Sequence, residues 1–63
     1  MDEYQERVNV EHQELDFKLE KLNAFLESEK CQEITEAEQR RMKRQALLME
    51  LYVEVLAERI EAF

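Results

Sequence analysis

Residues 42–63, MKRQALLMELYVEVLAERIEAF, place apolar side chains at alternating intervals of four and three residues. These intervals are the a and d positions of a heptad, which line the side of an α-helix that packs against another helix. We therefore predict a helix over residues 36–62 with a continuous apolar packing surface, here called the seam. Its members in this half are Met42, Ala46, Met49, Val53, Leu56, Ile60 and Phe63.

The first half of the chain repeats this spacing and predicts a second helix over residues 2–28. Two members of its seam are polar, Gln5 and His12. We expect His12 to set the register of the two helices, and not to act as a general base or a metal ligand. The apolar members are Val8, Leu15, Leu19, Leu22 and Leu26.

The connection between the two helices is predicted at residues 29–35, although the chain contains no glycine and no proline. The sequence Thr35-Glu36-Ala37-Glu38 marks the start of the second helix as a capping box, in which the Thr35 hydroxyl and the Glu38 carboxylate both accept backbone amides. A connection this short forces two helices of similar length to run antiparallel. The fold class is therefore all-α, a single coiled-coil-like antiparallel hairpin domain.

A second set of apolar residues lies outside the seam, and a hairpin cannot cover both sides of its own helices. A chain of 63 residues also buries too little surface to offset the entropy cost of folding comfortably. We therefore expect the hairpin to form a homo-oligomeric helical bundle, as a dimer or a tetramer. The predicted interface residues are Val10, Phe17, Leu48, Tyr52 and Val55.

Composition excludes several classes of protein. The net charge of −7 makes direct nucleic-acid binding unfavourable. The chain has no long apolar run, so we expect a cytoplasmic protein without a membrane span or a secretory signal. No catalytic or metal-binding arrangement of residues is evident, and no cofactor is expected. The single cysteine, Cys31, is predicted to fill space under the connection, with an intermolecular disulfide or a reactive thiol as the alternatives.

The strongest candidate for a binding site is the basic segment at residues 40–44. One interpretation is structural: Glu20, Glu27 and Glu29 neutralise the segment from the first helix, and Glu36 pairs with Arg40. The alternative is an anion site near the oligomer interface, where arginines contact phosphate and a tyrosine stacks on a base. The residues predicted to bind such a ligand are Arg40, Arg41, Lys43, Arg44, Tyr52 and Arg59.

An acidic row follows on the second helix. Like charges one turn apart are mildly unfavourable in an isolated helix. The row is either a solvated outer surface or a surface that docks on a basic partner. Its members are Glu50, Glu54, Glu58 and Glu61.

The chain resembles a group of small proteins from tailed phages and prophages, loosely known as a crAss-phage-related family. The resemblance spans nearly the whole chain, apart from Cys31 and Gln32, which replace a more apolar turn. It implies a phage context and assigns no site residues. The segments that carry it are Tyr4-Gln5-Glu6-Arg7-Val8, Glu14-Leu15, Lys18-Leu19, Lys21-Leu22, Ala24-Phe25-Leu26-Glu27-Ser28, Glu38-Gln39, Gln45, Met49, Tyr52, Leu56 and Glu58-Arg59-Ile60.

Together these observations predict a non-enzymatic phage protein for counter-defence or host takeover that acts by stoichiometric binding. In the leading hypothesis an oligomer sequesters an anionic nucleotide immune signal. In the second, the protein docks on a host or defence protein, as anti-CRISPR proteins do. A purely structural bundle is a third possibility, and it predicts neither ligand nor host partner.

Overall fold

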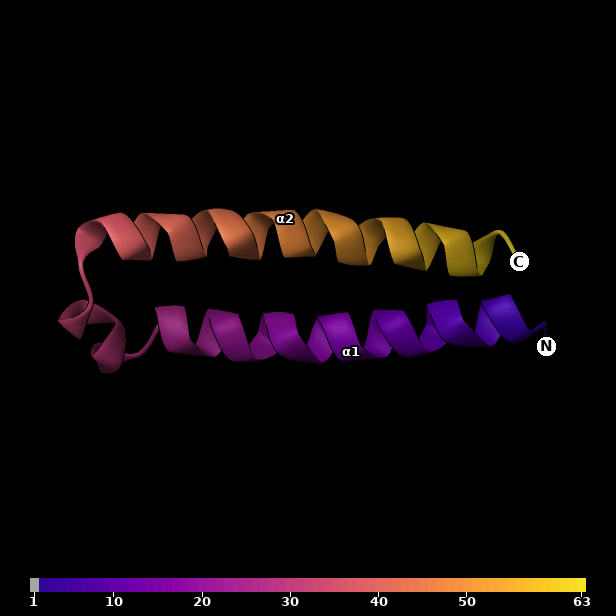
Figure 1. Ribbon diagram of the computed structural model, residues 1–63, viewed down its shortest axis with the longest axis horizontal. Coiled ribbons are helices and arrows are strands. Elements are labelled where there is room, and N and C mark those ends of the chain that lie inside the picture. Colours follow the sequence, from indigo (N-terminus) through magenta and orange to yellow (C-terminus); the bar gives the residue numbers. More distant parts are fainter. Residues whose placement is uncertain (1) are drawn as a thin grey trace.

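The computed structural model describes residues 2–63, which form an antiparallel helical hairpin (Figure 1). Helix α1 spans Glu3–Leu26 and helix α2 spans Glu36–Glu61, with a short 3₁₀-helix, η1, at Glu29–Glu33 between them. The two ends of the chain lie together at the end opposite the connection, and the Cα atoms extend over 45 Å. The predicted fold class of an all-α two-helix hairpin is confirmed.

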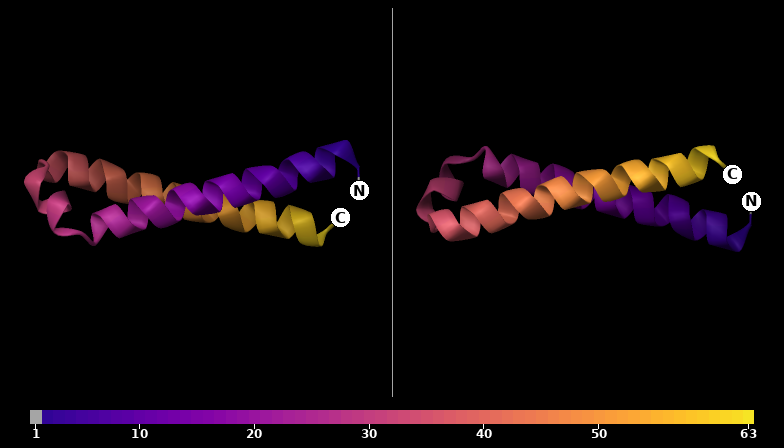
Figure 2. Two further views of the ribbon diagram at one scale, coloured as in Figure 1. Left: turned by 90° about the horizontal axis from the view of Figure 1, so that it is seen from below. Right: turned by 90° about the horizontal axis from the view of Figure 1, so that it is seen from above.

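The core of the hairpin is the predicted seam. Val8 and Leu19 of α1 and Ala46 and Leu56 of α2 are buried, and Leu56 has no exposed surface. The remaining seam residues are half-buried except Phe63, since a pair of helices can enclose only the centre of its contact. The helices cross one another, as the views from below and from above in Figure 2 show.

The open end of the hairpin is held by two aromatic rings. Tyr4 and Phe63 pack edge to face, with ring centroids 5.7 Å apart and an interplanar angle of 74°. This is a favourable aromatic geometry, worth about 1 kcal/mol beyond the burial of area. Tyr4 remains 48% exposed, so this contact positions its ring without burying it.

Helix α1 ends at Leu26, two residues before the predicted end, because the chain tightens there. The Phe25 carbonyl accepts both the Ser28 amide at 3.0 Å and the Ser28 hydroxyl at 2.6 Å. Such i→i+3 bonds close a tighter turn than that of an α-helix. The chain then enters η1, where Cys31 is 2% exposed, which confirms its predicted place under the connection.

Gln39 fastens the connection to α2. Its side-chain amide donates to the carbonyl of Cys31 at 2.8 Å and to the carbonyl of Ile34 at 3.0 Å. Backbone carbonyls in an irregular segment need partners when water is partly excluded. One glutamine on the first turns of α2 therefore satisfies two carbonyls of the connection and fixes where α2 begins.

We predict that Gln39→Ala lowers the free energy of unfolding by about 1–2 kcal/mol, because two side-chain hydrogen bonds are lost. Urea unfolding followed by circular dichroism, at one fixed protein concentration, measures this. Gln13→Ala is the matched control, since Gln13 is exposed on α1 and the change in helix propensity is the same. Equal effects of the two substitutions would contradict a role for the Gln39 bonds.

Candidate functional site

The basic segment at residues 40–44 divides between two sides of α2. Successive residues on an α-helix are rotated by about 100°, so neighbours in sequence do not share a side. Arg41 and Arg44 line one groove of about 340 Å³ along α2, which extends to the seam residue Met49. This groove, here called the α2 groove, is lined by Arg41, Arg44, Gln45, Leu48, Met49 and Tyr52.

The other two basic residues of the segment lie outside the α2 groove. Arg40 and Lys43 line a separate, smaller hollow of about 220 Å³ together with Glu36 and Gln39. The structure therefore brings together three of the six predicted ligand-binding residues, Arg41, Arg44 and Tyr52. Arg59 is outside the α2 groove, although its charge lies near enough to Tyr52 to influence that phenol.

Three groove residues were not predicted to bind a ligand: Gln45, Met49 and Leu48, of which Leu48 was predicted only for the oligomer interface. Gln45 and Met49 follow Arg41 at intervals of four, and Leu48 and Tyr52 follow Arg44 in the same way. Side chains four residues apart form ridges on a helix surface, and a groove lies between two such ridges. These two parallel rows are the sequence signal that could have identified the groove residues. The first row is not obvious from the sequence, because Met49 also belongs to the seam.

The only ion pair among residues 2–63 joins Arg41 Nε to a carboxylate oxygen of Glu38 at 2.8 Å. Glu20, Glu27 and Glu29 thus make no ion pair with the basic segment, and the predicted pair between Glu36 and Arg40 is not formed. The structural interpretation is therefore not supported by direct ion pairs to these glutamates. Arg44 makes no ion pair among residues 2–63.

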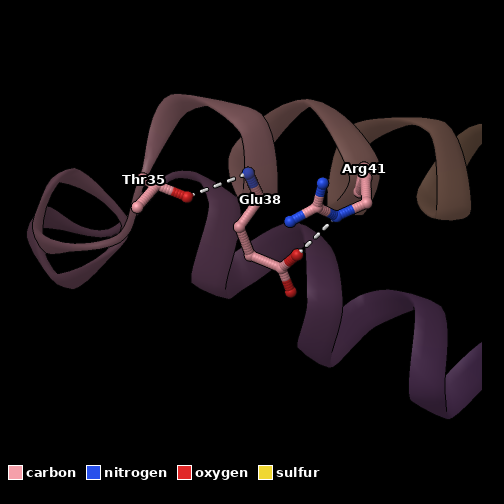
Figure 3. Close-up of polar contacts among 3 residues, drawn as sticks. All are labelled: Thr35, Glu38 and Arg41. Atoms are coloured by element: carbon pink, nitrogen blue, oxygen red, sulfur yellow. Dashed lines mark hydrogen bonds and ion pairs between the residues drawn. The ribbon is translucent and has the colours of Figure 1, made fainter.

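The capping box at the start of α2 is only half formed. The Thr35 hydroxyl accepts the Glu38 amide at 3.2 Å, as predicted. The Glu38 side chain turns instead toward Arg41, as Figure 3 shows. An exposed carboxylate gains more from a charge-assisted bond to a guanidinium than from a neutral amide. Consequently Glu38 orients Arg41 at the end of the α2 groove.

At the other end of the groove, Tyr52 is held by α1. Its hydroxyl donates a hydrogen bond to a carboxylate oxygen of Glu11. This bond raises the pKa of Tyr52 above its ordinary value, with burial and the Glu11 charge acting in the same direction and Arg59 opposing them. The phenol is therefore protonated at neutral pH, and its ring is anchored while 47% of the residue remains exposed.

Helix α1 carries a groove of the opposite character, with a volume of about 360 Å³. Four glutamates surround one arginine and one valine in it. Such a surface repels anions and favours cationic side chains. The lining residues of this α1 groove are Glu3, Glu6, Arg7, Val10, Glu11 and Glu14.

The five residues predicted to form an oligomer interface are exposed on two different sides of the hairpin. Val10 and Phe17 lie on the side of α1 that faces away from its seam, and Lys21 Nζ lies 4.5 Å from the centre of the Phe17 ring. Leu48, Tyr52 and Val55 lie on α2. One flat contact therefore cannot cover both sets.

The described residues contain no group of three or more potential metal ligands. No helix within residues 2–63 has the length and apolarity required to cross a membrane. His12 is half-buried in the seam.

The α2 groove has the chemistry of an anion site. Two guanidinium groups can each donate two hydrogen bonds to phosphate or carboxylate oxygens, and the anchored tyrosine ring offers a flat surface. A protein-family model with the description Sequestin matches residues 2–62. The chain belongs to the Sequestin family. The name of the Sequestin family suggests a sequestering role, that is, binding rather than catalysis.

The Sequestin match fits the expectation of a small protein that acts by binding, and it does not address the resemblance to the crAss-phage-related group. No curated protein and no solved structure matches the chain.

We predict that Glu11→Ala lowers the pKa of Tyr52 toward about 10, because the carboxylate that stabilises the protonated phenol is removed. Absorbance at alkaline pH measures this in a Tyr4→Phe background, where Tyr52 is the only phenol. The bond contributes stability that is fully present below the unfolded pKa of tyrosine and is lost as the pH rises through the higher folded value. Glu14→Ala is the control, and an equal fall in that variant would contradict the assignment.

Proposed function

We propose that the protein sequesters an anionic nucleotide by stoichiometric binding in the α2 groove. The observation that carries this proposal is the arrangement of Arg41, Arg44 and Tyr52 along one groove. Tyr52 follows Arg41 by eleven positions, which is about 16 Å along a helix. The groove is thus long enough for phosphates at one end and a base at the other.

Each lining residue has a distinct role in this proposal. Arg44, which makes no ion pair among residues 2–63, binds phosphate oxygens bidentately. Arg41 adds the terminal nitrogens that its bond to Glu38 leaves available. The Tyr52 ring stacks on the base, and the Gln45 side-chain amide, which now makes only a 4.0 Å contact with Met49 sulfur, bonds to a polar edge of the ligand.

The family name and the resemblance together give this binding a biological setting. We propose a phage-encoded protein that acts in the bacterial cytoplasm and lowers the free concentration of a nucleotide immune signal. Cyclic nucleotides and ADP-ribose-type nucleotides combine phosphates with a base and fit the chemistry of the groove. Sequestration needs no chemical step, so an excess of protein and a low dissociation constant are sufficient.

A second candidate function is inhibition of a host or defence protein by direct docking. The observation in its favour is the exposed apolar surface at Leu47, Leu48, Leu51 and Val55. Apolar patches of this kind frequently mark protein interaction sites. A stoichiometric partner recovered from a host lysate, lost in Leu48→Lys, would favour this function, whereas a purely structural bundle would bind neither partner nor nucleotide.

We predict that Arg44→Gln weakens nucleotide binding by about 10- to 100-fold, because a charge-assisted hydrogen bond to phosphate is lost. Isothermal titration calorimetry with cyclic ADP-ribose and with cyclic dinucleotides measures this. Lys43→Gln is the matched control, since it removes one adjacent positive charge outside the groove. No binding by the wild type, or equal losses in both variants, would refute the proposed site.

We also predict that Tyr52→Leu weakens binding of the same nucleotides by about tenfold, because stacking on the base is lost. Inorganic pyrophosphate has no base, so its affinity should not change in this variant. The effect of Tyr52→Leu on pyrophosphate separates stacking from a general disturbance of the groove. A similar loss for pyrophosphate and for the nucleotides would show that Tyr52 does not contact a base.

A further inference from the structure

The middle of α2 carries an apolar band that no other part of residues 2–63 covers. Leu47, Leu48, Leu51 and Val55 are between 50% and 64% exposed. They lie on the outer side of α2, because the seam residues Ala46, Met49, Val53 and Leu56 turn toward α1. Four large apolar side chains within nine residues make a continuous surface, here called the α2 apolar band.

Opposite charges lie on the two sides of this band along the helix. The basic residues Arg40, Arg41, Lys43 and Arg44 precede it, and the acidic residues Glu54, Glu58 and Glu61 overlap its end and follow it. A helix that is basic at one end and acidic at the other is complementary to an antiparallel copy of itself. We propose that a second copy of the chain binds this face, with the two α2 helices antiparallel.

A specific register pairs apolar residues at the centre of the band and residues of opposite charge toward the ends of the helices. If Leu48 of one copy lies beside Leu51 of the other, the heptad places Arg41 beside Glu58 of the second copy. The same register places Arg40 beside Glu61. The two-fold symmetry of such a dimer repeats each contact, so every ion pair occurs twice. The ion pairs select direction and register, whereas the band supplies most of the buried area.

The register follows a rule that is visible within the hairpin itself. In the antiparallel packing of α1 on α2, residues that flank the seam on the same side meet, as Glu11 and Tyr52 do through their hydrogen bond. Applied to the outer side of α2, the same geometry brings Arg59 of one copy beside Glu38 of the other. No pair of like charges comes into direct opposition among these positions.

The dimer would also complete the α2 groove, a consequence that rests on the proposed function. In this register Tyr52 and Val55 of the second copy lie beside Gln45 and Arg44 of the first. A groove that is open on the single hairpin is thereby closed from both chains. Arg59 of the second copy then approaches the Arg41 end of the groove. In this way an arginine that lies outside the groove of its own chain contributes to the groove of the other chain.

The first test is the mass of the protein in solution. Sedimentation equilibrium at micromolar concentration, with a reductant to keep Cys31 reduced, should give twice the 7.7 kDa of one chain. Leu51→Lys should raise the dissociation constant of the dimer more than tenfold, because it buries a charged ammonium group against Leu48 of the other copy. Val10→Lys is the matched control, since Val10 is 51% exposed on α1 and Leu51 is 50% exposed on α2.

Circular dichroism verifies that each variant keeps its helices. A wild-type monomer overturns the proposal, and so does a dimer that Val10→Lys disrupts and Leu51→Lys does not. Dissociation by Leu51→Lys with a stable Val10→Lys dimer supports it.

The second test is a charge exchange that fixes the register. Glu61→Arg should weaken the dimer about tenfold. The new arginine would repel Arg40 of the other copy, and the two-fold symmetry makes this contact occur twice. Adding Arg40→Glu should restore the wild-type dissociation constant, while Glu20→Arg, an exposed acid on α1, should leave it unchanged. A double variant no tighter than Glu61→Arg alone overturns the antiparallel register.

The two proposals fail separately. Leu51, Arg40 and Glu61 lie outside the α2 groove. A dimer that binds no nucleotide would refute the proposed function and leave the interface in place. A monomer that binds cyclic ADP-ribose or a cyclic dinucleotide would refute the interface and leave the proposed function in place.

Discussion

The packing of α1 on α2 along a single seam is the constraint on which the rest of the molecule depends. Two helices share only one line of contact, so the buried core consists of Val8, Leu19, Ala46 and Leu56, with Cys31 under the connection. Every other side chain meets solvent on at least one side. The outer surface of each helix is therefore available for binding, and its charge can change without disturbing the core.

Heptad spacing was sufficient to predict the hairpin, because the same period that places Leu56 in the sequence also turns it toward α1. The site was less predictable. Basic residues adjacent in sequence, such as Arg40 and Arg41, suggest one cluster. On the helix, however, successive residues point in different directions, so the two arginines lie in separate hollows. Whether Glu38 bonds a backbone amide or Arg41 depends on a small difference in free energy between the two hydrogen bonds. No sequence pattern predicts that difference. The bond between Tyr52 and Glu11 depends on how α1 and α2 are aligned.

Two residues of the α2 groove, the proposed binding surface, are already held in place on the single hairpin. Exposed arginines and tyrosines on a helix normally lose rotamer freedom when a ligand binds, and this loss reduces affinity. Here Glu38 restrains Arg41 and Glu11 restrains Tyr52 before any ligand arrives. Restraint at both ends of one groove suits the sequestering role that the Sequestin name suggests, because tight binding has to come from few contacts.

The connection reverses the chain without a residue of positive φ anywhere in residues 2–63. Turns that need a residue in the left-handed conformation favour glycine or asparagine at that position. This connection has no such residue, so it does not need glycine or asparagine. Its shape depends instead on the Gln39 amide, which lies outside the connection. During evolution the connection is therefore free to vary in sequence while position 39 is not, so distant relatives should be sought by the spacing of their seams and not by a turn motif.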